Sequence, residues 1–360
     1  MGLHGKNNPA AIALKPIETS QRFGIPAGQR KATLVDVARV AGVAPITVSR
    51  VINQPGQVKQ KTLLKVRQAI EEIGYVPNLV AGALATSRSR LVAVFLPVLT
   101  NPIFSDMFQV ITDRLSAAGY QVLLGVSGYN AEAEQKQIQA ILSRRPDGVI
   151  LTGTVHTDVS RKLLRAARIP VVETWDMTPD PIDMLVGFSH EDIGREMAYY
   201  LIAKGYRRFG YVEVDDPRGA KRTAAFFEAL AGYGITDVPT ETFPAPASLR
   251  YGIEGLRKLL PHLPGEGPLA VVCTSDTMAH GVLLEAARQG LHVPKDIAVM
   301  GHGDMYFAAN LVPSLTTVRV EGDQIGKLAA DALLERLESA HDLKPLKCDV
   351  GFTIVQRESA

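Results

Sequence analysis

The stretch TLVDVARVAGVAPITVSRVIN, residues 33–53, decides how the N-terminal part of this chain folds. Thr33 is followed three residues later by Asp36, which is close to the capping box that begins a helix. Apolar residues then recur at helical spacing, and Gly42 ends this first helix. Pro45 suits the first turn of a second helix, where no backbone N–H donor is needed. Two short helices joined by a glycine turn predict a helix-turn-helix unit.

The same unit has the residues for a small core. We expect Val48 and Val51 to face inward on the second helix, which leaves four polar side chains facing outward: Thr47, Ser49, Arg50 and Asn53. A third helix over residues 61–73 is predicted to close the core through Leu64, Ala69, Ile70 and Ile73.

Charge separates this N-terminal part from the remainder of the chain. Residues 1–90 contain thirteen Lys and Arg and four Asp and Glu, a net charge of +9. Of the 39 basic and 37 acidic residues in the whole chain, 26 and 33 are left for the remainder, a net charge of −7. A basic module on an acidic body is typical of phosphate binding, and it argues against a helical bundle that binds another protein.

The helix-turn-helix stretch, with the segments EEIGYVPN and ALA that follow it, resembles the lactose-repressor family of bacterial regulators. The resemblance runs from about residue 33 to the C-terminus. It implies base-reading positions at Pro45, Ile46 and Arg50, where arginine suits guanine and the other two offer only apolar contact. It also implies phosphate contacts, with ordinary solvated or capping roles as the alternative, for Thr33, Thr47, Ser49 and Asn53.

Residues 78–85 form the hinge that the resemblance implies. Alone, the segment is too short for a stable helix. In the family it becomes helical on DNA, paired with its dimer mate, and Leu84 matches a leucine that wedges into the minor groove. Ala81 and Ala85 flank Leu84 with small side chains, and Asn78 begins the segment, so we include all four among the candidate DNA contacts. The alternative is that Leu84 is an ordinary linker residue.

Four regions follow from these patterns. Residues 1–30 lack periodicity and are predicted to be disordered. The helix-turn-helix headpiece is placed at 31–77, the hinge helix and linker at 78–89, and an effector-binding and dimerisation body at 90–360.

The body alternates short apolar strands with helices, beginning with the strand LVAVFLP. This alternation predicts parallel sheets with helices on both faces, and it restarts after Gly187. We therefore expect two doubly wound lobes of the periplasmic-binding-protein type, with a ligand crevice outside the carboxyl ends of the strands. The family layout implies that lobe 1 takes residues 90–187 and 317–344, and lobe 2 takes residues 188–316 and 345–360.

Residues at the strand ends are the candidates for effector binding. The resemblance implies contact for Asp276, for which an N-cap role is the alternative. It also implies contact for Arg222, in a segment similar to the family's Arg-x-x-Gly-Phe, and its guanidinium suits a carboxylate. A solvated arginine is the alternative there. The other candidates are Ser127, Thr152, Trp175, Ser189, His190 and His302.

The segments ILTGTVHT, PVVETWDM, VGFSHEDIGREM and GHGDM are similar to the gluconate-utilisation repressor branch of the family. This similarity implies a sugar-acid effector, gluconate or a relative such as 2-ketogluconate. A neutral sugar or a purine-type corepressor remains open, as do the sign of the response and activation in place of repression.

Other classes of function find little support in the sequence. It has no P-loop, no His-Glu-x-x-His and no paired Cys-x-x-Cys, so we expect no enzyme, cofactor or metal site. Two isolated cysteines, no signal core and no long apolar segment favour a cytoplasmic protein without membrane contact. We therefore predict a homodimeric repressor that binds operator DNA. We prefer this function to that of a sugar-binding transport protein or a sugar-modifying enzyme.

Overall fold

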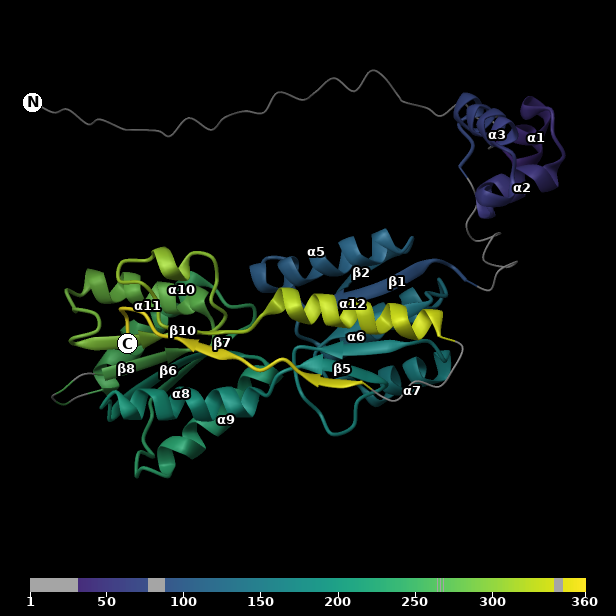
Figure 1. Ribbon diagram of the computed structural model, residues 1–360. Helices are drawn as coiled ribbons and strands as arrows, with labels where there is room; N and C mark the ends of the chain where they lie inside the picture. The colour runs from purple at the N-terminus through teal and green to yellow at the C-terminus, as the bar shows by residue number, and fades with distance from the viewer. Residues whose placement is uncertain (1–31, 77–87, 264, 266, 268, 340–345) are drawn as a thin grey trace, which may run out of the picture. The chain divides into compact units, whose positions relative to one another are not determined.

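The computed structural model describes residues 32–76, 88–263, 265, 267, 269–339 and 346–360 (Figure 1). The chain divides into two compact units, Met1–Gly82 and Ala83–Ala360. The expected disordered tail lies outside the described residues, and so do the hinge candidates Asn78, Ala81, Leu84 and Ala85. Within the described part, no helix is both long enough and apolar enough to cross a membrane.

The first unit is the predicted helix-turn-helix headpiece. Its elements are α1 (Leu34–Ala41), α2 (Pro45–Asn53), the 3-10 turn η1 (Pro55–Gln57) and α3 (Gln60–Ile73). The capping box is confirmed, because Thr33 Oγ1 accepts the Asp36 N–H at 3.4 Å and the Asp36 carboxylate accepts the Thr33 N–H at 2.9 Å. Gly42 closes α1 with φ +62°, a conformation that favours glycine.

The headpiece core differs from the prediction in one position of α3. Val48 and Val51 are buried as expected, but Leu64 is 57% exposed and Leu63 is buried in its place. The inward stripe of α3 therefore contains Leu63, Val66 and Ala69, at the i, i+3 and i+6 spacing of one helix face. Because Leu63 and Leu64 are adjacent, the sequence alone does not show which of the two faces the core.

Lobe 1 of the second unit is built on a parallel sheet with the strand order β11-β5-β4-β3-β1-β2. Its strands are β1 (Leu91–Leu96), β2 (Gln121–Val126), β3 (Gly148–Thr152), β4 (Val171–Thr174), β5 (Met184–Gly187) and β11 (Lys347–Asp349). One face packs against α5 (Pro102–Ala117) and α12 (Gly322–Glu338), and the other against α6 (Ala131–Leu142) and α7 (Asp158–Ala167). The alternating apolar strands thus form a sheet buried on both faces.

Lobe 2 repeats this plan with the strand order β7-β6-β8-β9, again parallel. The strands are β6 (Arg208–Asp215), β7 (Thr240–Pro244), β8 (Leu269–Cys273) and β9 (Ile297–Met300). Helices α8 (His190–Ala203) and α9 (Pro217–Ala231) cover one face, and α10 (Leu249–Leu259) and α11 (Asp276–Arg288) cover the other. Two doubly wound lobes are therefore present, as the alternation predicts.

The chain crosses between the lobes near Gly187 and again at β10 (Thr317–Arg319), which pairs antiparallel with β12 (Thr353–Val355) (Figure 1). The expected third crossing at residue 344 is too early. Cys348 of β11 pairs with Val186 at the edge of the lobe 1 sheet, so the chain leaves lobe 1 only after Asp349.

Candidate functional site

Six of the described candidates for DNA contact lie on α2, and the seventh, Thr33, is the N-cap of α1. Four of them are exposed: Pro45, Ile46, Arg50 and Asn53. Thr47 and Ser49 are half-buried, and Ser49 Oγ accepts a hydrogen bond from Asn53 Nδ2 at 3.3 Å. Thr33 is half-buried and engaged in the cap of α1. An isoleucine with 61% of its surface exposed beside an exposed arginine gives α2 both apolar and cationic contact surface.

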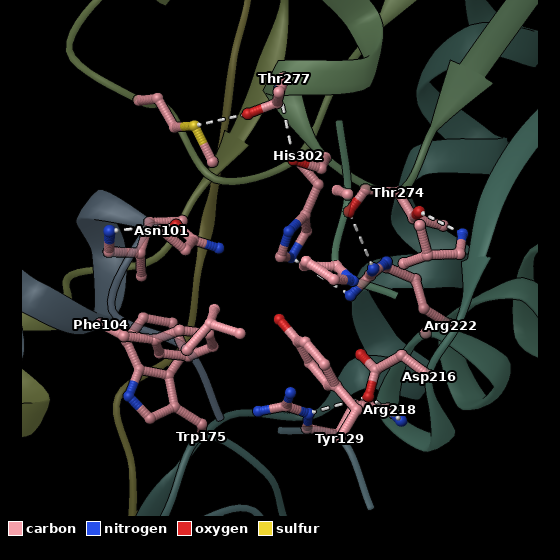
Figure 2. A pocket seen from close by; sticks show the side chains of 18 of the residues that line it. Asn101, Phe104, Tyr129, Trp175, Asp216, Arg218, Arg222, Thr274, Thr277 and His302 are labelled. Carbon is pink, nitrogen blue, oxygen red and sulfur yellow. Dashed lines mark hydrogen bonds and ion pairs between the residues drawn. The ribbon is translucent and has the colours of Figure 1, made fainter. Parts of the chain in front are cut away.

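A cavity of about 200 Å³ lies at the carboxyl ends of the strands of both lobes (Figure 2). Asn101, Phe104 and Trp175 of lobe 1 lie on one side, and the residues facing them from lobe 2 include Arg222 and His302. Four of the eight predicted effector residues line this cavity: Trp175, His190, Arg222 and His302.

Arg222, on the second turn of α9, is a buried cation with only neutral acceptors around it. Its Nη1 donates to His190 Nδ1 at 3.0 Å and to His302 Nε2 at 3.4 Å, and its Nη2 donates to the Thr274 carbonyl at 3.2 Å. The Nε–H is buried and has no acceptor in the described protein. The side chain is 4% exposed, and no ion pair joins it to any described carboxylate. Arg222 therefore leaves the cavity with an uncompensated positive charge.

The two histidines beside Arg222 are held in the neutral form. Burial and the adjacent Arg222 charge lower the pKa of His190 well below its usual value, and the same two causes lower the pKa of His302. His190 Nε2–H donates to the Trp175 carbonyl at 3.0 Å, which leaves Nδ1 to accept from Arg222. Both rings consequently orient the guanidinium without adding charge to the cavity.

Arg218 and Asp216 are cavity residues that the sequence analysis missed. Arg218 Nε donates to Asp216 Oδ1 at 3.3 Å, and the guanidinium lies 5.5 Å and 5.4 Å from the ring centroids of Phe104 and Tyr129. Arg218 precedes Arg222 by four residues, so both project from the same face of α9. This spacing, directly after the strand FGYVEV, was the signal available in the sequence.

Trp175 contributes an apolar part of the wall. Its backbone is left-handed, with φ +65°, which is uncommon for a side chain of this size. The indole makes edge contacts with Phe104 and Phe188, at centroid distances of 5.1 Å and 5.8 Å. Because its Nε1–H points to Met107 Sδ at 2.7 Å, the ring presents apolar surface to the cavity.

Asp276 lies behind the cavity wall. Its Oδ1 accepts from Thr317 Oγ1 at 2.5 Å and its Oδ2 accepts from the Met305 N–H at 2.7 Å, so both oxygens are occupied. The N-cap alternative for Asp276 is wrong, because Ser275 caps α11 by accepting the Thr277 N–H. Burial raises the pKa of Asp276 to about 6. The carboxylate thus holds the loop that follows β9 against the start of β10.

The remaining candidates lie away from this cavity. Ser127 and Thr152 line a second cavity of about 130 Å³, which shares Arg218 with the first. Thr152 Oγ1 donates to the Phe95 carbonyl at 2.8 Å. Ser189 lines neither cavity and is the N-cap of α8, where its Oγ accepts the Asp192 N–H at 3.0 Å.

Comparison with known proteins covers both units. Residues 33–78 match the bacterial regulatory proteins of the lacI family, and residues 198–360 match the periplasmic binding protein-like domain. The chain is 36% identical over 331 residues to the HTH-type transcriptional regulator GntR of Pseudomonas aeruginosa, covering 91% of this chain and 96% of that protein.

Solved structures are similar over the same extent. A transcriptional regulator of the LacI family from Silicibacter pomeroyi superposes with a TM-score of 0.84 at 35% identity, covering 91% of this chain and 99% of that one. The lac repressor dimer bound to operator and the anti-inducer ONPF gives a TM-score of 0.77 at 27% identity, covering 92% and 99%. The similar proteins are transcriptional regulators, with the headpiece and body in the same order along the chain.

Proposed function

The chain belongs to the lacI family of bacterial regulatory proteins, and from this premise we propose that it is a dimeric repressor released from its operator by a sugar acid. The observation that supports the ligand class is the buried guanidinium of Arg222, which no described carboxylate neutralises. A buried charge without a counter-ion is unfavourable. A ligand carboxylate supplies the missing charge, and its two oxygens fit the arginine fork.

The other cavity residues suit the rest of such a ligand. His190 and His302 hold the guanidinium in place, and the unsatisfied Nε–H of Arg222 is a further donor. The Arg218–Asp216 pair offers both a donor and an acceptor to hydroxyl groups, while Trp175 offers apolar surface to the carbon chain. For the remaining candidates we propose indirect roles: Asp276 and Ser189 position the cavity wall, and Ser127 and Thr152 belong to the adjoining second cavity.

At the DNA end we propose that Arg50 reads a guanine and that Pro45 and Ile46 make apolar contacts in the major groove. Phosphate contacts set the register of α2 and do not specify sequence. They are proposed for Thr33, Thr47, Ser49 and Asn53. The wedge role of Leu84 and the hinge roles of Asn78, Ala81 and Ala85 are proposed on the family resemblance.

Release of DNA follows from linkage. An effector lowers operator affinity only when it binds the DNA-incompetent arrangement of the protein more tightly. Two recognition helices in a symmetric dimer would read a pseudo-palindromic operator, and the related lac repressor is a dimer on its operator. A regulator of this kind acts where the chromosome is, so we propose a cytoplasmic location and a binding function without catalysis.

Calorimetric titration of the full chain tests the ligand class. We expect heat with gluconate or 2-ketogluconate, none with glucose or hypoxanthine, and loss of the heat in Arg222→Ala while operator binding remains. Arg222→Lys is the matched control, because it keeps a cation but removes the bidentate fork. Heat with glucose or hypoxanthine, or sugar-acid binding that survives Arg222→Ala, would exclude the proposed carboxylate site.

A further inference from the structure

A further charged depression, distinct from the two cavities described above, lies at the opposite edge of the lobe 1 sheet, where the amino ends of β1, β3 and β4 meet. It encloses about 540 Å³, and we call it the arginine groove. Its charged lining residues are Arg88, Arg145, Asp147, Arg168 and Arg336. Since the effector cavity lies at the carboxyl ends of the same strands, the groove is separated from it by the length of the sheet.

Arg336 is paired with Asp183 at 3.2 Å and Arg88 donates to the Leu337 carbonyl at 2.9 Å, so the charge that we consider in the groove is that of Arg145 and Arg168. Asp147 is engaged elsewhere, because its oxygens accept from the Ser89 N–H, the Ser89 hydroxyl and the Arg90 N–H at 2.8–2.9 Å. No ion pair in the described part of the chain involves Arg145 or Arg168. Both side chains are exposed, on a body whose net charge is −7.

Both arginines occupy backbone positions that usually favour glycine. Arg145 has φ +52° and Arg168 has φ +53°. Each follows a helix, α6 or α7, and leads into the next strand, so the two positions are equivalent in consecutive helix–strand units. Arginine thus stands at two left-handed positions, where glycine would be less strained, and both arginines line the same groove. We take this as an indication that the two positive charges have a function.

We propose that the arginine groove binds the phosphate backbone of DNA beside the site held by the headpiece. Arg88 lies twelve positions along the chain after Val76, the last described residue of the headpiece unit. A chain of that length spans at most about 43 Å at ~3.6 Å per residue. The linker is therefore long enough to let the groove reach a duplex that α2 occupies. Exposed arginines in an open depression suit a phosphate backbone, whereas a small anion is usually enclosed by buried donors.

The experiment measures operator binding by fluorescence anisotropy over a series of salt concentrations, on a duplex with long flanks. The variant is the full chain with Arg145→Gly and Arg168→Gly, which removes both charges while relieving the left-handed backbone. At ~0.9 per phosphate contact, the slope of log affinity against log salt should fall by about 1.8 for each subunit that engages. Gluconate affinity should stay unchanged, and thermal stability should be equal or higher.

Arg144→Gln is the matched control, because Arg144 is exposed on the same helix end but does not line the groove. It should leave the slope nearly unaltered. The alternative is that Arg145 and Arg168 only neutralise the helix C-termini. In that case the double variant unfolds at lower temperature and keeps the wild-type slope, which overturns the proposal. Should the glycine variant fail to fold, Asn at both positions tolerates the same backbone and gives the same test. A loss of stabilisation by inorganic phosphate without a change in the DNA slope would also reject DNA as the occupant.

Discussion

At the scale of single residues, the body contains another buried histidine, and its charge state is opposite to that of His190 and His302. His156 lies between Glu134 and Glu173, with Nδ1 2.6 Å from Glu134 Oε1 and Nε2 3.4 Å from Glu173 Oε1. Burial alone would lower the pKa of His156, but the hydrogen bonds and charges of the two glutamates raise it to about 9. His156 is therefore a cation at neutral pH, held by two buried anions of lobe 1.

The raised pKa predicts how the stability of the body depends on pH. A histidine with a folded-state pKa above its unfolded value near 6.5 stabilises fully below about pH 6.5, and this stabilisation is lost as pH rises through about 9. The difference is worth roughly 3 kcal/mol at most. We expect the free energy of unfolding, measured with urea, to fall between pH 7 and 9.5 in the wild type. His156→Gln should start lower and show a flatter profile, and parallel profiles for the two proteins would refute the assignment.

Residues with a local motif could be predicted from the sequence, and residues positioned by the tertiary fold could not. The similarity of its segment to the family's Arg-x-x-Gly-Phe predicts Arg222 as a cavity residue. The three-residue spacing of Thr33 and Asp36 predicts the capping box. Arg218 was missed because only the approach of lobe 1 brings Phe104 and Tyr129 to its guanidinium. The sequence predicts Asp276 at the carboxyl end of β8, but it does not reveal the hydrogen bond that its carboxylate accepts from Thr317, 41 residues later.

At the scale of elements, the periodicity of apolar residues predicts the strands and helices of the body. It does not predict a polar strand at the edge of a sheet. β11 has the sequence KCD and would not be assigned as a strand by its composition. It becomes one because β5 offers a free parallel edge. For the same reason the third crossing between lobes could not be placed from the sequence alone.

Helix α3 gives a test of the corrected headpiece core. Leu63 is 7% exposed and packs with Val37 and Val66, whereas Leu64 is 57% exposed. Leu63→Ala should destabilise the headpiece by about 2–4 kcal/mol. Leu64→Ala, the matched control one residue away, should cost less than about 0.5 kcal/mol. Hydrogen exchange of the α3 amides in the full chain measures both, and equal protection in the two variants would contradict the observed orientation of the helix.

At the scale of the whole body, the two lobes are joined beside the effector cavity by an ion pair between a half-buried lysine and a buried aspartate. Lys221 Nζ of α9 lies 2.7 Å from Asp176 Oδ2, and Thr154 Oγ1 donates to the same oxygen at 2.5 Å. Asp176 follows β4 of lobe 1 and is fully buried, while Lys221 directly precedes Arg222 in lobe 2. The pair therefore stabilises the arrangement in which both lobes line one cavity.

Linkage predicts what removal of this pair does to regulation. Lys221→Met alone would leave a buried carboxylate without its partner, which is strongly destabilising. Lys221→Met combined with Asp176→Asn removes both charges and should fold with stability nearer that of the wild type. We propose that the sugar acid binds the arrangement described here, in which the pair brings the lobes together, and that the pair breaks when the lobes open. Without the pair the sugar acid must supply more of the free energy that closes the lobes, so its apparent affinity should fall several-fold. Titration of gluconate against the preformed operator complex measures this as a higher concentration for half-release, with operator affinity in the absence of ligand kept or raised. Half-release at the wild-type concentration would mean that the Lys221–Asp176 pair does not bias the lobes, and that closure depends on the ligand contacts alone.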